Sequence, residues 1–373
     1  MIGGRARADV PDVDPMRDEA APELLAVRSG EDLDWDRIEA YLRDRLPAEL
    51  GLDGAFHVLQ FPNGAANLTY MIRFGERELV LRRPPFGRLA PGAHDMKREY
   101  KVLSRLWRDF DRAPRAYLFC DDPGIAGADF FVMERRHGEV IRGVIPETMR
   151  GHANVGHRIG RALVDAIAEF HRLDPAACGL SDLGRPEGFV ERQVAGWKKR
   201  WDLVAHPEHD AAMSDVHARL ASSMPTSERV SFVHNDLKLD NCMFDPADPD
   251  RVTAFFDWDM TTLGDPLIDL GTLLNYWPDP SDGDRSRGSH PGMERMGLPT
   301  RDEVKRHYAS QSGFDLSRID WYEAFALWKT ATVGAQLHHR WLEGDSTDPR
   351  MAAMGDSIPV LAASAERLLE ALD

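Results

Sequence analysis

The sequence predicts an α+β fold in two parts, a strand-rich N-terminal part and a mainly helical C-terminal part. Between residues 56 and 83, short runs have the composition and turns of strands, whereas after residue 134 apolar residues recur at helical spacing. A chain of 373 residues is also long enough for more than one compact unit. We expect the parts to cover residues 31–134 and 135–373. We predict a flexible arm over residues 1–30, which hold prolines and acids but few large apolar side chains.

The predicted N-terminal part alternates helices and strands. Trp35, Ile38 and Leu42 recur at helical spacing, and Pro47 should end that helix. The residues 75–77 form a turn signal between two of the strands, which indicates an antiparallel hairpin. The further predicted elements are strands over 56–61, 70–74 and 78–83, a helix over 96–110 and a buried strand over 130–134.

The predicted C-terminal part is built on two long apolar helical stripes, over residues 155–170 and 321–339. Short strand-like runs at residues 230–233 and 252–256 flank a dense polar cluster. Residues 278–299 are rich in Gly, Pro, Ser and Asp and should form a loop.

Composition excludes several classes of protein. The chain has 46 Lys and Arg against 62 Asp and Glu, a formal net charge of −16, so nucleic acid is not an expected partner. No apolar run approaches the length of a membrane span and no signal pattern opens the chain, so we expect a soluble cytoplasmic protein. The cysteines at 120, 178 and 242 are odd in number and widely spaced, which favours buried free thiols.

The polar cluster carries the clearest chemistry. Residues 234–241 read His-Asn-Asp-Leu-Lys-Leu-Asp-Asn, and Asp257 follows after a strand-like run. Loops that transfer phosphoryl groups from ATP place an Asp that accepts the hydroxyl proton, an Asn five positions later that binds Mg²⁺, and a metal-binding Asp on the next hairpin. Asp236, Asn241 and Asp257 fit this order, as the candidate catalytic residue and two candidate metal ligands. The alternative is that all three are turn residues.

With this loop, the chain resembles the aminoglycoside phosphotransferase-like kinases over roughly residues 35–345. Residues 265–271, Asp-Pro-x-x-Asp-Leu-Gly, resemble the segment that follows the metal-binding Asp of that family. The resemblance implies a protein-kinase-like fold of two lobes, a β-rich N-lobe and a mainly helical C-lobe, with ATP and Mg²⁺ as cofactors. Asp269 is expected to hold the catalytic loop by hydrogen bonds rather than to bind metal.

The N-terminal part offers candidate nucleotide-binding residues. Asn63, Gly64 and Asn67 lie between two predicted strands, where a phosphate-covering loop would lie, although Asn-Gly is equally typical of a hairpin turn. Arg82 stands where kinases of this type carry a Lys, and Glu99 is the expected partner on the next helix. An Arg–Glu surface pair without a catalytic role is the alternative, and Arg for Lys leaves weak nucleotide binding or a degenerate kinase open.

The run from Phe131 to Gly138 resembles the strand and hinge that join the two kinase lobes. The resemblance implies that backbone near Glu134 and Arg136 binds adenine. His171 ends an apolar helical stripe and is expected to be a core residue.

Within the family, residues 81–85, 93–94, 98–100 and 191–197 resemble the kinase-like domain fused to some acyl-CoA dehydrogenases. This subgroup implies phosphorylation of a hydroxyl on an acyl-CoA, with 4-hydroxyacyl-CoA as the leading example. A basic run of candidate substrate-binding residues could hold the CoA phosphates or form a solvated helix face: Arg192, Lys198, Lys199 and Arg200. The net charge by itself would instead favour a cationic acceptor such as an aminoglycoside.

We therefore expect an ATP-dependent kinase that acts on a small molecule such as an acyl-CoA, with neither nucleic acid nor membrane as partner. An aminoglycoside or another small alcohol is the alternative acceptor. A noncatalytic nucleotide-binding module is the second alternative, because Ala66 replaces the Ser usual before Asn67 and Arg82 replaces Lys. A protein kinase is less expected, since too few residues separate Asp257 from Asp265 for a long activation segment.

Overall fold

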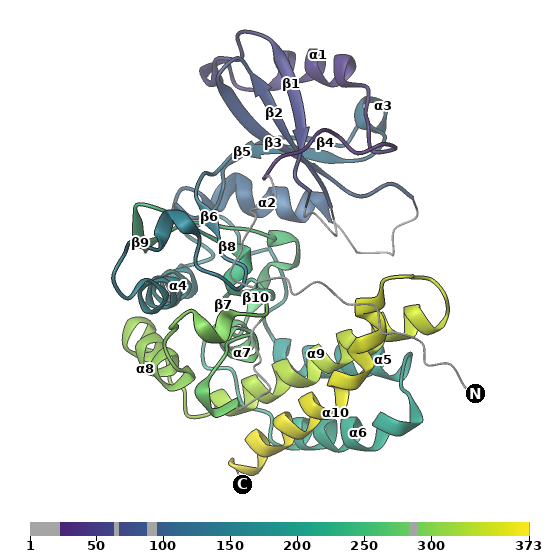
Figure 1. Ribbon diagram of the computed structural model, residues 1–373, viewed down its shortest axis with the longest axis vertical. Coiled ribbons are helices and arrows are strands. Elements are labelled where there is room, and N and C mark those ends of the chain that lie inside the picture. Colours follow the sequence, from purple (N-terminus) through teal and green to yellow (C-terminus); the bar gives the residue numbers. More distant parts are fainter. Residues whose placement is uncertain (1–22, 63–66, 88–94, 283–288, 373) are drawn as a thin grey trace, which may run out of the picture.

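The structure, a computed structural model, describes residues 23–62, 67–87, 95–282 and 289–372. Figure 1 shows an upper lobe built around a β-sheet and a larger lower lobe dominated by helices. The two-lobed α+β architecture expected from the sequence is therefore confirmed.

The N-lobe is a five-stranded sheet with helices on both faces, in the strand order β1-β2-β3-β5-β4. Its elements are α1 (Trp35–Arg45), β1 (Phe56–Gln60), β2 (Leu68–Phe74), β3 (Arg77–Arg83), α2 (Met96–Leu106), β4 (Ala116–Cys120), α3 (Pro123–Ala126) and β5 (Phe130–Glu134). Leu79 and Leu81 pack on the face that α1 and α3 cover, whereas Val80 packs in the core that includes α2. Because side chains alternate along a strand, Arg82 points to the α2 side.

Most N-lobe predictions are confirmed, and two differ. The helix α2 ends at Leu106, not at residue 110. Phe110 is nevertheless fully buried, because it packs against Phe170 and Phe255 with ring centroids 5.4 and 5.3 Å away. Strand β4 was not predicted, since a short apolar run without alternation does not distinguish a strand from a buried helix segment.

The C-lobe packs helices around two small sheets, with strand orders β6-β8-β9 and β10-β7. The helices are α4 (Val155–Arg172), α5 (Phe189–Asp202), α6 (Pro207–Ser222), α7 (Leu267–Asn275), α8 (Arg301–Ser312), α9 (Ile319–Leu342) and α10 (Pro349–Glu370). The strands are β6 (Glu139–Val140), β7 (Ser231–Val233), β8 (Cys242–Asp245), β9 (Asp248–Phe255) and β10 (Thr262–Gly264). Trp321 and Trp328 of α9 are fully buried, so this helix forms the centre of the lobe.

Part of the predicted arm is attached to the N-lobe. Leu25 and Gln60 exchange two backbone hydrogen bonds of 2.9 and 2.8 Å, which place residues near 25 beside β1. Residues 1–22 lie outside the described part. The three cysteines are buried and free, as expected. Among the described residues, no helix is both long and apolar enough to span a bilayer.

Candidate active site

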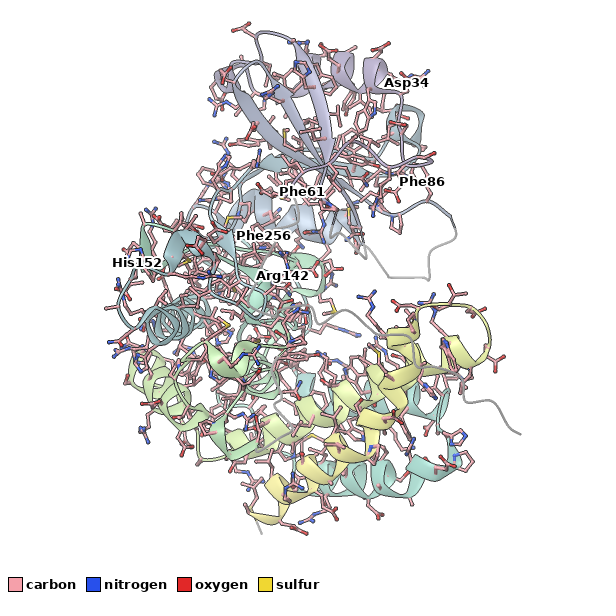
Figure 2. The ribbon with its side chains drawn as sticks, viewed as in Figure 1. Asp34, Phe61, Phe86, Arg142, His152 and Phe256 are labelled. Carbon is pink, nitrogen blue, oxygen red and sulfur yellow. The ribbon has the colours of Figure 1, made fainter. Side chains whose placement is uncertain are left out.

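The predicted catalytic loop connects β7 to β8 where the two lobes meet. Phe256, which precedes the candidate metal ligand Asp257, lies at this junction in Figure 2, below Phe61 at the base of the N-lobe sheet. The Phe256 amide donates to the Asn241 carbonyl at 2.9 Å, so the two metal-ligand candidates lie on adjacent segments. Residues that the sequence predicted for one site are therefore also close together in the folded chain.

The carboxylate of Asp236 is partly exposed and held from one side. Asn241 Nδ2 donates to Asp236 Oδ2 at 2.8 Å, and Lys238 Nζ lies 3.4 Å from the same oxygen. No hydrogen bond from a described residue reaches Oδ1. Burial disfavours the charged form of Lys238, but the carboxylates of Asp236 and Asp240 outweigh burial and raise its pKa.

The candidate metal ligands present oxygen atoms. The Asn241 amide nitrogen donates to both the carbonyl and the carboxylate of Asp236, at 2.8 Å each, so its amide oxygen faces elsewhere. Asp257 adopts a left-handed conformation with φ 66°, and its side chain is 36% exposed. No group of three or more His, Cys, Asp or Glu gathers to hold a metal within the described residues. One carboxylate and one amide oxygen fit Mg²⁺, which completes its shell with phosphate and water.

Arg82 contacts one carboxylate of its own lobe, Glu99, and one of the C-lobe, Asp257. Its Nε lies 3.0 Å from Glu99 Oε2, and its Nη2 lies 2.7 Å from Asp257 Oδ1. The predicted pairing of Arg82 with Glu99 is confirmed. Glu99 is only 1% exposed, and this burial raises its pKa to about 7. The positive charge of Arg82 opposes the shift, but the Arg82 guanidinium also contacts Asp257.

Asp269 holds the catalytic loop from below. Its two carboxylate oxygens accept the backbone amides of His234 and Asn235 at 2.6 and 2.7 Å. His171, which is fully buried, bonds Asp269 at 3.2 Å and the Tyr308 hydroxyl at 2.7 Å. The structural roles expected for Asp269 and His171 agree with these contacts.

The predicted hinge residues direct their side chains to neighbouring backbone. Arg136 pairs with Glu134 at 3.2 Å and donates to the Asp111 carbonyl at 2.7 Å. The Glu134 amide already donates to the Arg115 carbonyl within the sheet, so this amide is not available to a base. Asn67 is buried at the start of β2, while Asn63 and Gly64 lie outside the described residues.

The four predicted substrate-binding residues separate on α5. Arg192 bonds backbone carbonyls of the preceding loop, Lys198 pairs with Asp202, and Lys199 is exposed. Arg200 places its guanidinium 4.3 Å from the centre of the Trp197 ring. The same ring lies 5.5 Å from Lys329 Nζ, so of the four only Arg200 shares a described contact with a residue that reaches the catalytic loop.

Lys329 is a residue at the site that sequence reasoning missed. It projects from α9, and its Nζ donates to the Asn235 carbonyl, beside Asp236, at 3.0 Å. A signal was present in the sequence, because Lys329 is a charged residue within the largely buried part of α9. The aromatic residues at helical spacing predicted a core helix here and no site residue.

Comparisons with known proteins agree with this geometry. A sequence model of the phosphotransferase enzyme family matches residues 57–305. Acyl-CoA dehydrogenase family member 11 of Rattus norvegicus is 32% identical over 337 residues, which are 87% of this chain and 42% of that protein. The chain therefore spans less than half the length of this relative.

Two solved structures share the fold. A protein of Ralstonia eutropha, provisionally named an aminoglycoside phosphotransferase, is 25% identical with a TM-score of 0.77, covering 91% of this chain and 99% of its own. A thermostable mutant of aminoglycoside phosphotransferase APH(4)-Ia, in a ternary complex with ADP and hygromycin B, is 15% identical with a TM-score of 0.55, covering 89% and 97%. The kinase-like fold is thus present, and the chain belongs to the phosphotransferase enzyme family.

Proposed function

We propose that the protein is an ATP-dependent kinase that transfers the γ-phosphoryl group to a hydroxyl group of a small molecule. The observation that carries this proposal is the arrangement of Asp236, Asn241 and Asp257 at the junction of the lobes, in the order and setting that phosphoryl transfer requires. Family membership supports the same reaction.

In the proposed reaction, Asp236 Oδ1 orients the acceptor hydroxyl and accepts its proton. A lone pair of the hydroxyl oxygen forms the new bond to the γ-phosphorus, and the bond to the bridging oxygen breaks, so that ADP leaves with that electron pair. Asn241 and Asp257 would hold Mg²⁺, which supplies charge neutralisation at the phosphates. Lys238, 3.4 Å from Asp236, adds positive charge beside the acceptor oxygen.

The nucleotide side of this proposal rests on Arg82 and Glu99, with Asn67 and the hinge backbone near Glu134 and Arg136, apart from the Glu134 amide, as further candidates. Arg82 already contacts Asp257, so nucleotide and metal would share or displace this ion pair as they bind.

For the acceptor, we propose a hydroxyacyl-CoA such as a 4-hydroxyacyl-CoA. The names of the relatives that match most of this chain support this choice, since they are acyl-CoA dehydrogenase family members. An aminoglycoside or another alcohol is the second candidate, supported by the likeness to the Ralstonia eutropha structure.

The test is release of ADP from Mg-ATP with 4-hydroxypentanoyl-CoA, 4-hydroxypentanoate or an aminoglycoside as acceptor. Asp236→Asn should lower turnover by roughly 10²–10⁴-fold with little change in ATP binding, because a positioned base contributes about that much. Asp215→Asn, at an exposed position on α6, is the matched control. Equal turnover in Asp236→Asn and the control would remove Asp236 from the chemistry. Binding of Mg-ATP without turnover of any acceptor would favour the noncatalytic alternative.

A further inference from the structure

On the C-lobe side of the catalytic loop, Lys329 has a partly buried ammonium group with no carboxylate partner among the described residues. Lys329 Nζ donates one hydrogen bond, to the neutral carbonyl of Asn235 at 3.0 Å, and lies 5.5 Å from the centre of the Trp197 ring. No carboxylate in the described part of the chain forms an ion pair with it. An ammonium group has three donors, and the described residues accept from Lys329 at Asn235 alone, so donors are left for a ligand beside Asp236.

A second cation contacts the same ring. The guanidinium of Arg200 lies 4.3 Å from the centre of Trp197, a side chain that is only 9% exposed. Burial lowers the pKa of Lys329, and the positive charges of Arg200 and Lys238 add to that effect while Asp236 and Asp269 oppose it. Lys329 is partly buried and Arg200 is exposed, and like charges beside one ring are unfavourable unless a ligand offsets them. The cluster of Lys329, Arg200 and Trp197 therefore suits a hydrogen-bond-accepting oxygen with full or partial negative charge.

The cluster and the proposed nucleotide-binding pair belong to different lobes. Arg200 and Trp197 come from α5 and Lys329 from α9, both in the C-lobe, whereas Arg82 and Glu99 come from the N-lobe. The Asn235 carbonyl that Lys329 contacts belongs to the residue directly before Asp236. A molecule whose hydroxyl group reaches Asp236 would therefore present another part of itself to this cluster.

We propose that Lys329, with Arg200 at the same Trp197 ring, is a specificity-determining residue of the acceptor site that binds a carboxylate or thioester carbonyl oxygen of the acceptor. This inference rests on the proposed kinase function and deepens it. The local positive charge offsets the repulsion that a chain of net charge −16 exerts on an acidic acceptor, because more distant charges are screened beyond about 8 Å. The same cluster repels a polycationic aminoglycoside.

The decisive variant is Lys329→Met, which removes the ammonium group and retains an unbranched side chain. Three acceptors that share a hydroxyl at the same carbon separate the possibilities: 4-hydroxypentanoyl-CoA, 4-hydroxypentanoate and pentane-1,4-diol. We expect the variant to raise KM for the thioester, the free acid or both by roughly 10- to 100-fold, the effect of losing a charge-assisted hydrogen bond. KM for Mg-ATP and KM for the diol should change by less than about threefold. Lys329→Arg should recover part of the loss.

Arg340→Met is the matched control, since it removes one positive charge from an exposed position on the same helix. Equal loss with the diol, the thioester and the free acid, or a fall in kcat alone, would mean that Lys329 acts only by holding the Asn235 carbonyl, and would overturn the inference. Comparing the thioester with the free acid shows whether Lys329 binds a thioester carbonyl oxygen or a carboxylate oxygen.

Calorimetric titration of the same acceptors, with no turnover involved, separates this inference from the proposed function. Tight binding of an acid or thioester that weakens in Lys329→Met supports the inference even if no phosphoryl group is transferred. Wild-type protein that phosphorylates the diol or an aminoglycoside but does not bind the acid or the thioester leaves the kinase function in place and overturns the role of Lys329.

Discussion

The cations on the two sides of Asp236 differ in what neutralises them. On the N-lobe side, Arg82 contacts two carboxylates, Glu99 at 3.0 Å and Asp257 at 2.7 Å. On the C-lobe side, Lys329 contacts a neutral carbonyl and an aromatic ring. The first cation is thus part of an ion network that holds the lobes together, whereas the second keeps capacity to bind an anion.

This difference predicts that Arg82 contributes to stability and Lys329 to acceptor specificity. Removing one member of a buried ion network leaves an uncompensated charge and is costly, whereas removing an unpaired cation relieves a desolvation penalty. We therefore expect the same substitution, a cation to Met, to destabilise the fold at Arg82 and to alter acceptor choice at Lys329.

The largest effect is expected for Arg82→Met. The substitution removes the cation that pairs with the buried carboxylate of Glu99, so the free energy of unfolding should fall by about 3–5 kcal/mol. Denaturant titration measures the loss, and the double variant Arg82→Met/Glu99→Gln should recover part of it. If Arg82→Met lowers the free energy of unfolding as little as Lys329→Met does, the proposed difference between the two cations is wrong.

The next effect is expected for Asp269→Asn. An amide offers one acceptor oxygen in place of two, so the backbone amide of either His234 or Asn235 loses its partner. Stability should fall by about 1.5–3 kcal/mol, the range for a hydrogen bond to a charged group. Turnover should fall as well, while KM for Mg-ATP changes little. Unchanged stability in thermal unfolding would contradict the role assigned to Asp269.

The raised pKa of Glu99 predicts a pH dependence of stability. Because the folded state binds this proton more tightly than the unfolded state, the contribution is fully present below about pH 4.5 and is lost as pH rises through about 7. In protein without nucleotide, the difference in unfolding free energy between wild type and Glu99→Gln should vary over this window. A constant difference would show that Arg82 keeps Glu99 ionised throughout.

The smallest effect on stability is expected for Lys329→Met. The loss of one hydrogen bond to the Asn235 carbonyl and the relief of desolvation oppose each other, so the free energy of unfolding should change by less than about 1 kcal/mol. Denaturant titration beside Arg82→Met gives the comparison directly. A loss of several kcal/mol in Lys329→Met would show that Lys329 serves the fold, as Arg82 does.

Local patterns predicted most of the elements and the order of the site residues. Strand β5 agrees with its predicted bounds, and α1 and α2 begin where helical spacing begins. The end of α2 and the existence of β4 were not predictable, because Phe110 and residues 116–120 are placed by packing against other elements.

The sequence by itself determined the two-part α+β fold, the catalytic-loop signal of Asp236, Asn241 and Asp257, and the pairing of Arg82 with Glu99, because each depends on local spacing or on a carboxylate that burial obliges to find a partner. Only the tertiary structure decided which basic residues face the catalytic loop. Lys329 contacts the loop at Asn235 from 94 positions further along the chain, and Arg200 contacts the Trp197 ring that Lys329 also approaches. Such contacts depend on how α5 and α9 pack around the loop, and residue spacing along one helix carries no information about its neighbours.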